Sequence, residues 1–199
     1  MKVLLVAVVG SDNFGDEAMF KVAYDRLSHS GHDVTVATYK TDRAKERFPE
    51  VNFIRLPTLS RVEIYKCLVG IPARILNSSE YGALYVAGAL NSIYFGHTCL
   101  LWSLVKQFEK EDKYVEFRPQ SVGPFFGRYR WFVERMVRDI VKSADKFYVR
   151  EKISYNYLRE MNSTLYYSIN VLFEFIIKNN FGCCNLQVPA YILICVCYV

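Results

Sequence analysis

Short apolar runs rich in β-branched and aromatic residues alternate along this chain with longer segments whose apolar residues recur at helical spacing. This alternation is typical of βαβ units, in which crossover helices join parallel strands. Several runs, such as Lys2–Val9, are almost entirely apolar, as expected where helices cover both faces of a sheet. The sequence therefore predicts an α/β fold with a mainly parallel sheet and helices on both faces.

The same pattern predicts where the elements lie. The expected strands are Lys2–Val9, Asp33–Thr38, Asn52–Leu56, Ala83–Ala87, Tyr114–Phe117 and Lys146–Val149. The expected helices are Asp16–Ser30, Leu59–Leu76, His97–Lys110, Arg128–Lys142 and Lys152–Met161. Ligands of open α/β sheets collect outside the carboxyl ends of the strands, so the loops that follow the strands form the candidate site.

Composition limits the class of protein. The 199 residues are 52% apolar and 23% charged, which is a globular composition. It excludes a disordered tail, a collagen-like fibre and a disulfide-stabilised miniprotein. The net charge of +5 permits an anionic ligand but does not indicate nucleic acid, and no nucleic-acid partner is expected.

Two apolar runs bear on location. The run after Met1 ends in Gly10 without a small-residue cleavage pattern, which favours a buried strand over a signal peptide. The closing run Val188–Val199 has 12 residues, fewer than the ~20 needed to span a bilayer. No transmembrane segment is therefore expected, and a peripheral membrane contact is left open.

Cysteine usage divides the chain. Four of the six cysteines lie in the last 17 residues. A reduced, cytoplasmic body is expected to precede an atypical apolar, Cys-rich tail over residues 179–199. The paired cysteines of that tail lack the two-residue gap usual for zinc ligands, and the three histidines are scattered, so no metal or cofactor is expected.

The loop after the first strand runs from Gly10 to Glu17. Two glycines permit close backbone approach, and the following helix start offers unpaired N–H groups to an anion. The loop is neither a dinucleotide fingerprint nor a P-loop, because it lacks G-x-G-x-x-G and the terminal Lys-Ser/Thr. Taken alone, Asp16 and Glu17 are also explained by capping of the helix.

Three later loops carry further candidate groups. Small residues around Gly88 and Asn91 let a ligand approach the backbone. Gln120 and Ser121 supply uncharged groups of the kind that orient sugar hydroxyls. Arg150 follows the last expected strand and is suited to bidentate capture of a carboxylate or phosphate, although pairing with the neighbouring Glu151 would explain it equally well.

Together, these loops resemble those of the polysaccharide pyruvyl transferase family. The matching segments are Asn13-Phe14-Gly15-Asp16-Glu17, Ala87-Gly88-Ala89-Leu90, Gln120-Ser121-Val122-Gly123-Pro124, Arg150-Glu151 with Ser154 and Leu158, and more weakly Ser168-Ile169-Asn170-Val171-Leu172-Phe173. The resemblance covers about residues 1–178 and implies a Rossmann-like domain, the amino-terminal half of a GT-B architecture. Each motif is short, and it is their order after successive strands that is specific.

The resemblance implies a transferase that moves the enolpyruvyl part of phosphoenolpyruvate onto two sugar hydroxyls, forms a cyclic ketal and releases phosphate. The acceptor would be a glycan or a lipid-linked sugar. By this similarity Asp16 is an acceptor-side polar or base residue and Arg150 a cation that binds the donor. Asn13, Gly15, Gly88, Asn91, Gln120 and Ser121 are then expected to line the site.

Departures from the family pattern support an alternative. Ala87 and Ala89 stand where glycine is expected, and Asn170 stands where aspartate is expected. The family also has a second domain with further basic residues, including a histidine, and no histidine follows His97 in this sequence. The alternative is a non-catalytic, truncated remnant or interaction module.

Overall fold

The computed structural model describes residues 1–161. The expectations for the tail over residues 179–199, for its cysteines and for the weak similarity at 168–173 lie outside the described residues. Within them, no helix is both long enough and apolar enough to cross a bilayer.

The described residues form a seven-stranded sheet in which every pair of strands is parallel. The strands are β1 (Lys2–Ala7), β2 (Asp33–Thr38), β3 (Asn52–Arg55), β4 (Ala83–Ala87), β5 (Ala89–Leu90), β6 (Tyr114–Val122) and β7 (Lys146–Val149). Their order is β3-β2-β1-β4-β6, with β7 paired to β6 and the short β5 paired to the last residues of β6. This is the strand order of a Rossmann-like fold: β2 and β3 are added on one side of β1, and the chain then crosses to the other side to form β4.

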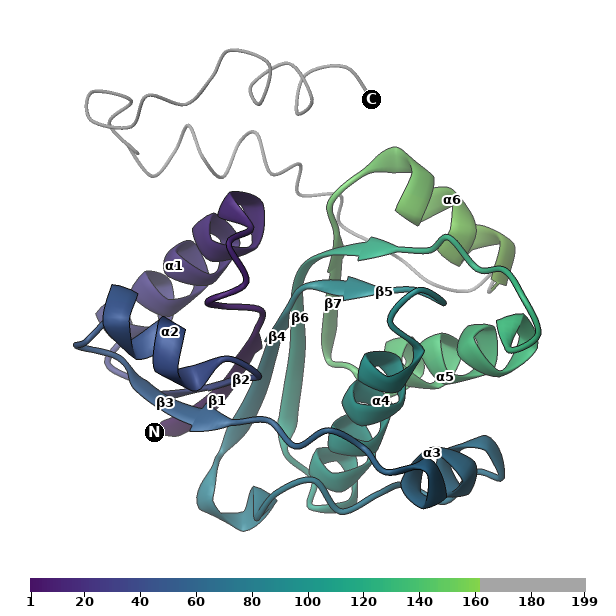
Figure 1. Ribbon diagram of the computed structural model, residues 1–199, viewed down its shortest axis with the longest axis horizontal. Helices are drawn as coiled ribbons and strands as arrows, with labels where there is room; N and C mark the ends of the chain where they lie inside the picture. The colour runs from purple at the N-terminus through teal and green to yellow at the C-terminus, as the bar shows by residue number, and fades with distance from the viewer. Residues whose placement is uncertain (162–199) are drawn as a thin grey trace.

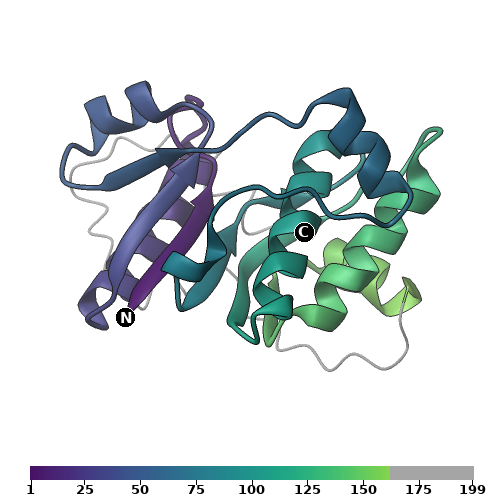
Figure 2. The ribbon, with the colours of Figure 1, turned by 90° about the horizontal axis from the view of Figure 1, so that it is seen from below.

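Helices cover both faces of the sheet, as predicted (Figures 1 and 2). They are α1 (Phe14–His29), α2 (Thr41–Arg47), α3 (Arg61–Leu68), α4 (Phe95–Lys110), α5 (Arg130–Ser143) and α6 (Lys152–Met161), with one 3₁₀ turn, η1 (Ser78–Glu80). Alternate residues of β1 belong to different cores, because successive side chains of a strand point to opposite faces. Val3 and Leu5 pack with α1 and α2, whereas Leu4 packs in the core that contains α3, α4 and α5.

The structure differs from the predicted elements in four main ways. The helix predicted over Leu59–Leu76 ends at Leu68, because Gly70 has a φ of +85° and Pro72 follows. The strand predicted to end at Phe117 continues to Val122, with a shift of register between Phe117 and Gln120 around Pro119. The helix α2 and the two-residue strand β5 were not predicted.

The loops after β1, β4, β6 and β7 therefore leave the same edge of the sheet, because parallel strands share one carboxyl edge. The crossing to the other side of β1 brings the loop at Gly10 next to the loop at Gly88. Direct contacts link the remaining loops: the Arg150 N–H donates to the Gln120 carbonyl at 2.9 Å, and the Ser121 N–H donates to the Gly88 carbonyl at 3.4 Å. This edge is where the candidate site is found.

Candidate functional site

The loop after β1 passes tightly against the start of α2. Thr38, at the end of β2, accepts a hydrogen bond from the Val9 N–H and donates one to the Val9 carbonyl, both at 3.1 Å. Gly10 follows with a φ of +77°, and a Cβ there would lie 3.0 Å from the Lys40 carbonyl oxygen. A residue with a side chain would be strained there and would push the loop off α2, so the glycine sets the course of the loop.

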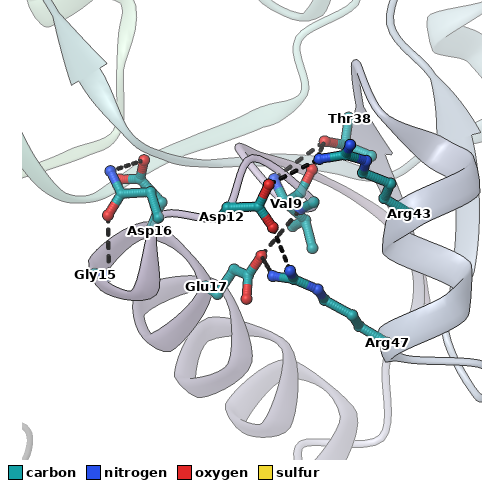
Figure 3. Close-up of polar contacts among 10 residues, drawn as sticks. Val9, Asp12, Gly15, Asp16, Glu17, Thr38, Arg43 and Arg47 are labelled. Atoms are coloured by element: carbon teal, nitrogen blue, oxygen red, sulfur yellow. Dashed lines mark hydrogen bonds and ion pairs between the residues drawn. The ribbon is translucent and has the colours of Figure 1, made fainter. Parts of the chain in front are cut away.

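Two carboxylates of this loop are held by arginines of α2 (Figure 3). Asp12 accepts from Arg43 Nη1 at 2.7 Å and pairs with Arg47. Glu17 also pairs with Arg47, and its Oε1 accepts from the Gly10 N–H at 3.3 Å. These carboxylates fasten the loop to α2. Asp16 lies on the other side of the α1 terminus, away from this network.

The first turn of α1 presents Asp16 through a local cap. Asn13 Oδ1 accepts from the Gly15 N–H at 3.1 Å, and Asn13 Nδ2 donates to Asp16 Oδ2 at 2.8 Å (Figure 3). Asn13 and Gly15 are exposed, and Asp16 is partly buried. Burial raises the pKa of the Asp16 carboxyl above its ordinary value, while the Arg150 charge and the Asn13 hydrogen bond act in the opposite direction. Asp16 is thus a stronger base than an ordinary aspartate.

Arg150 comes to the same place from the end of β7. Its Nε donates to Glu151 Oε2 at 3.1 Å, and its Nη1 lies 3.8 Å from Met19 Sδ of α1. The side chain is 37% exposed. Arg150 therefore spans from β7 to α1, and its charge acts on Asp16. The fold brings together these two predicted site residues, which are far apart in the sequence.

Glu151 binds several neighbours at once. Besides Arg150, its carboxylate accepts from Ser121 Oγ at 3.4 Å and from Ser154 Oγ. Ser154 is fully buried, and its Oγ accepts from the Val122 N–H at 2.7 Å. The pairing of Arg150 with Glu151 that the sequence left open is present. The same carboxylate also joins β6 to the start of α6.

Space remains beside Gly88. This glycine is buried, yet a Cβ built on it would meet no atom within 4 Å. Its carbonyl accepts from the Ser121 N–H, so it lies beside a residue whose hydroxyl contacts Glu151. The small residue leaves room for a ligand atom near the carboxyl end of β4.

Two predicted site residues turn inward instead of lining the site. Gln120 is 0% exposed, and its Nε2 donates to the carbonyl oxygens of Val86 at 2.9 Å and Arg118 at 2.7 Å. Asn91 is 6% exposed, and its Oδ1 accepts from the Tyr94 N–H at the start of α4. The Gln120 side chain thus bonds backbone carbonyls at the end of the β4–β6 pairing, and the Asn91 side chain bonds a backbone N–H just before α4.

Replacement of Gln120 tests this role. Glutamate is expected to destabilise the fold more than methionine does, because a carboxylate would face two carbonyl oxygens, whereas methionine only leaves them without a donor. The methionine variant should lose about 1–3 kcal/mol of unfolding free energy, the cost of unpaired buried groups. Urea unfolding of the two variants measures the difference. Equal stability of both variants and the wild type would contradict the structural role.

Sequence reasoning missed a second pair at this edge. The Tyr39 hydroxyl and His97 Nδ1 are 2.8 Å apart, and their rings meet edge to face. Burial raises the pKa of Tyr39 to about 12 and lowers the pKa of His97 to about 4. The imidazole is therefore neutral, and its Nδ1 shares a hydrogen bond with the Tyr39 hydroxyl. No local feature of the sequence singles out His97, and only Tyr39, which directly follows β2 and is distant in sequence, reveals the pair.

The rest of the described region adds no metal or disulfide chemistry. Among residues 1–161, no group of three His, Cys, Asp or Glu side chains is placed to hold a metal ion. Cys67 and Cys99 are both buried and free. The candidate site of the described residues therefore consists of Asp16, Arg150, the capped start of α1 and the space at Gly88.

Comparisons with known proteins give no independent assignment. No protein-family model matches this chain, and a search of curated proteins finds no match either. What is established is a parallel, helix-flanked Rossmann-like fold.

Proposed function

We propose that this protein transfers a pyruvyl group from phosphoenolpyruvate to hydroxyls of a glycan, as its resemblance to the polysaccharide pyruvyl transferase family implies. The observation that carries the proposal is that Arg150 reaches α1 at Met19 and that its charge acts on Asp16, at the carboxyl edge of the sheet. A cation and a base on one edge are the groups this chemistry needs.

Arg150 is the donor-binding group in this proposal. Its guanidinium is partly exposed, and a planar guanidinium matches the oxygens of a carboxylate or phosphate. Met19 of α1 lies beside it, and the amino-terminal end of α1 adds positive potential. Together, these groups favour a small dianion or trianion over a neutral ligand.

Asp16 is the acceptor-side base. In the reaction, one sugar hydroxyl adds to phosphoenolpyruvate, with its oxygen bonding to C2 and a proton going to the methylene carbon. A second hydroxyl then displaces phosphate from C2, which completes the ketal. The raised pKa of Asp16 suits it to take up a hydroxyl proton. In this proposal the hydroxyl of Ser121, whose N–H donates to the Gly88 carbonyl, contacts the acceptor.

The test is calorimetric titration of the full 199-residue chain with phosphoenolpyruvate, with pyruvate and inorganic phosphate as separate controls. We expect phosphoenolpyruvate to bind more tightly than either control, because it carries both anionic groups. Phosphate release on adding lipid-linked sugars would identify the acceptor. If phosphoenolpyruvate binds no better than phosphate, the proposal fails.

A non-catalytic module is the second candidate. Glu151 already neutralises part of the Arg150 charge, and Gln120 and Asn91 turn inward. These contacts fit a domain that keeps the fold without the chemistry. Binding of phosphoenolpyruvate without phosphate release, across all acceptors offered, would favour this candidate.

A further inference from the structure

Exposed apolar side chains gather at the starts of α4 and α5. Five of them make up what we call the aromatic surface: Ile93, Tyr94, Phe126, Tyr129 and Trp131, which are 44% to 62% exposed. The segments that carry them adjoin one another, since Phe95 stacks on Tyr129 with ring centroids 5.0 Å apart and the Phe126 N–H donates to Ser92 Oγ at 3.2 Å. Exposed apolar groups gathered in this way indicate an interaction surface.

Hydrogen bonds hold the loops that carry this surface. The Ser92 N–H donates to the Pro124 carbonyl at 3.2 Å, and the Gly123 N–H donates to the Leu90 carbonyl at 2.8 Å. The polar groups of Ser92 are thus used within the protein. The groups that the aromatic surface offers to a partner are therefore ring faces, aliphatic side chains and the cations around it.

The charged residues in the segments that carry the aromatic surface are mainly arginines. Residues 119–133 contain Arg128 and Arg130 and no carboxylate, and residues 88–105 contain no charged side chain. The nearest acid, Glu134, is paired with Arg130 at 2.7 Å. The Arg135 guanidinium lies 5.9 Å from the centre of the Trp131 ring. A partner of complementary charge must therefore be anionic.

We propose that the aromatic surface binds the headgroup region of an anionic lipid bilayer. Tryptophan and tyrosine favour the headgroup level of a membrane, and arginines beside them attract anionic lipids. Phe126 and Ile93 would enter the acyl boundary. This inference goes beyond the proposed function and does not depend on it. It would bring the carboxyl edge of the sheet close to the membrane, because Leu90 and Gly123 belong to both regions.

The test is co-sedimentation of the full chain with vesicles of phosphatidylcholine mixed with phosphatidylglycerol, and with vesicles of phosphatidylcholine alone. We expect binding to the mixed vesicles that weakens as salt is added, and much weaker binding to phosphatidylcholine. The Phe126→Ser/Trp131→Ser variant is expected to lose binding. The Arg128→Gln/Arg130→Gln variant is expected to weaken it by about fivefold per arginine.

Matched controls separate the surface from general apolarity and charge. Ile153→Ser removes an equally exposed apolar side chain from α6, and Lys110→Gln/Lys142→Gln removes two cations from the other ends of α4 and α5. Both should bind as the wild type does. The other tryptophan of the sequence, the buried Trp102, reports by its fluorescence emission that the variant lacking Trp131 is folded.

Three outcomes overturn the proposal: no binding to either vesicle, equal binding to both that salt does not change, or unchanged binding by the folded Phe126→Ser/Trp131→Ser variant. Self-association that this variant abolishes, without vesicle binding, would instead identify the surface as an interface between copies of the chain.

Discussion

The affinity for phosphoenolpyruvate is expected to fall about a hundredfold or more when Arg150 is replaced by glutamine, because the donor then loses a charge-assisted pair of hydrogen bonds. The affinity of the Arg150→Lys variant should lie between those of the wild type and the Arg150→Gln variant, since an ammonium keeps the charge but not the paired geometry. The measurement is the calorimetric titration of each variant. Asp16→Asn should leave donor affinity largely intact and remove phosphate release, which separates its role from that of Arg150.

Arg159→Gln is the matched control, because it removes an exposed arginine of α6. It should bind phosphoenolpyruvate as the wild type does. Arg150 also has a structural contact, its bond to Glu151. A purely structural role predicts a lowered melting temperature with unchanged donor affinity in the folded variant, and that result would remove Arg150 from the proposed mechanism.

Stability is expected to fall as the pH drops from 6.5 to 4, by up to about 3 kcal/mol from His97 alone. Burial lowers the pKa of His97 to about 4 in the folded protein, whereas an exposed histidine titrates near 6.5. The unfolded chain therefore binds the proton first in this window, and acid favours unfolding. Above pH 6.5 His97 is neutral in both the folded and the unfolded protein, so it no longer changes the free energy of unfolding with pH. Urea unfolding across this pH range measures the slope.

The His97→Gln variant isolates this effect, because an amide oxygen still accepts from the Tyr39 hydroxyl but does not titrate in this window. The wild type and the variant should differ in how steeply the free energy of unfolding changes with pH, and this difference is the contribution of His97. Asp16 acts with the opposite sign, since a raised carboxyl pKa stabilises the fold as the pH falls, and it contributes equally to both proteins. Parallel pH profiles would show that His97 is protonated in the folded state as easily as in water.

The parallel fold could be predicted because its strands are apolar on both faces. Runs such as Leu4–Val6 carry a signal that does not depend on distant contacts. The helix α2 has no such apolar pattern in its sequence, because in Thr41–Arg47 only Ala44 is buried. The extension of β6 could not be predicted for another reason. Proline and glycine, here Pro119 and Gly123, are typical of loops, and the register shift that accommodates Pro119 within β6 depends on β7.

The candidate site was predicted only in part. The positions of Asp16 and Arg150 follow from strand order and the shared carboxyl edge, so their meeting was accessible to sequence reasoning. The inward turn of Gln120 was not, because it depends on the Val86 carbonyl left free where β4 and β6 separate. Tyr39 and His97 were missed in the same way, since neither has a local signal that names its partner.

The contact of Arg150 with Met19 links the end of β7 to α1, the helix that follows β1 in the middle of the described sheet. A ligand held between them would couple its binding free energy to the docking of β7, because fraying of that strand would withdraw the arginine. Saturating donor should then slow hydrogen exchange at Val149 as well as at the α1 terminus. Ligand occupancy in such a protein would join β7 to the helix that follows β1 and so resist separation of the strands between them.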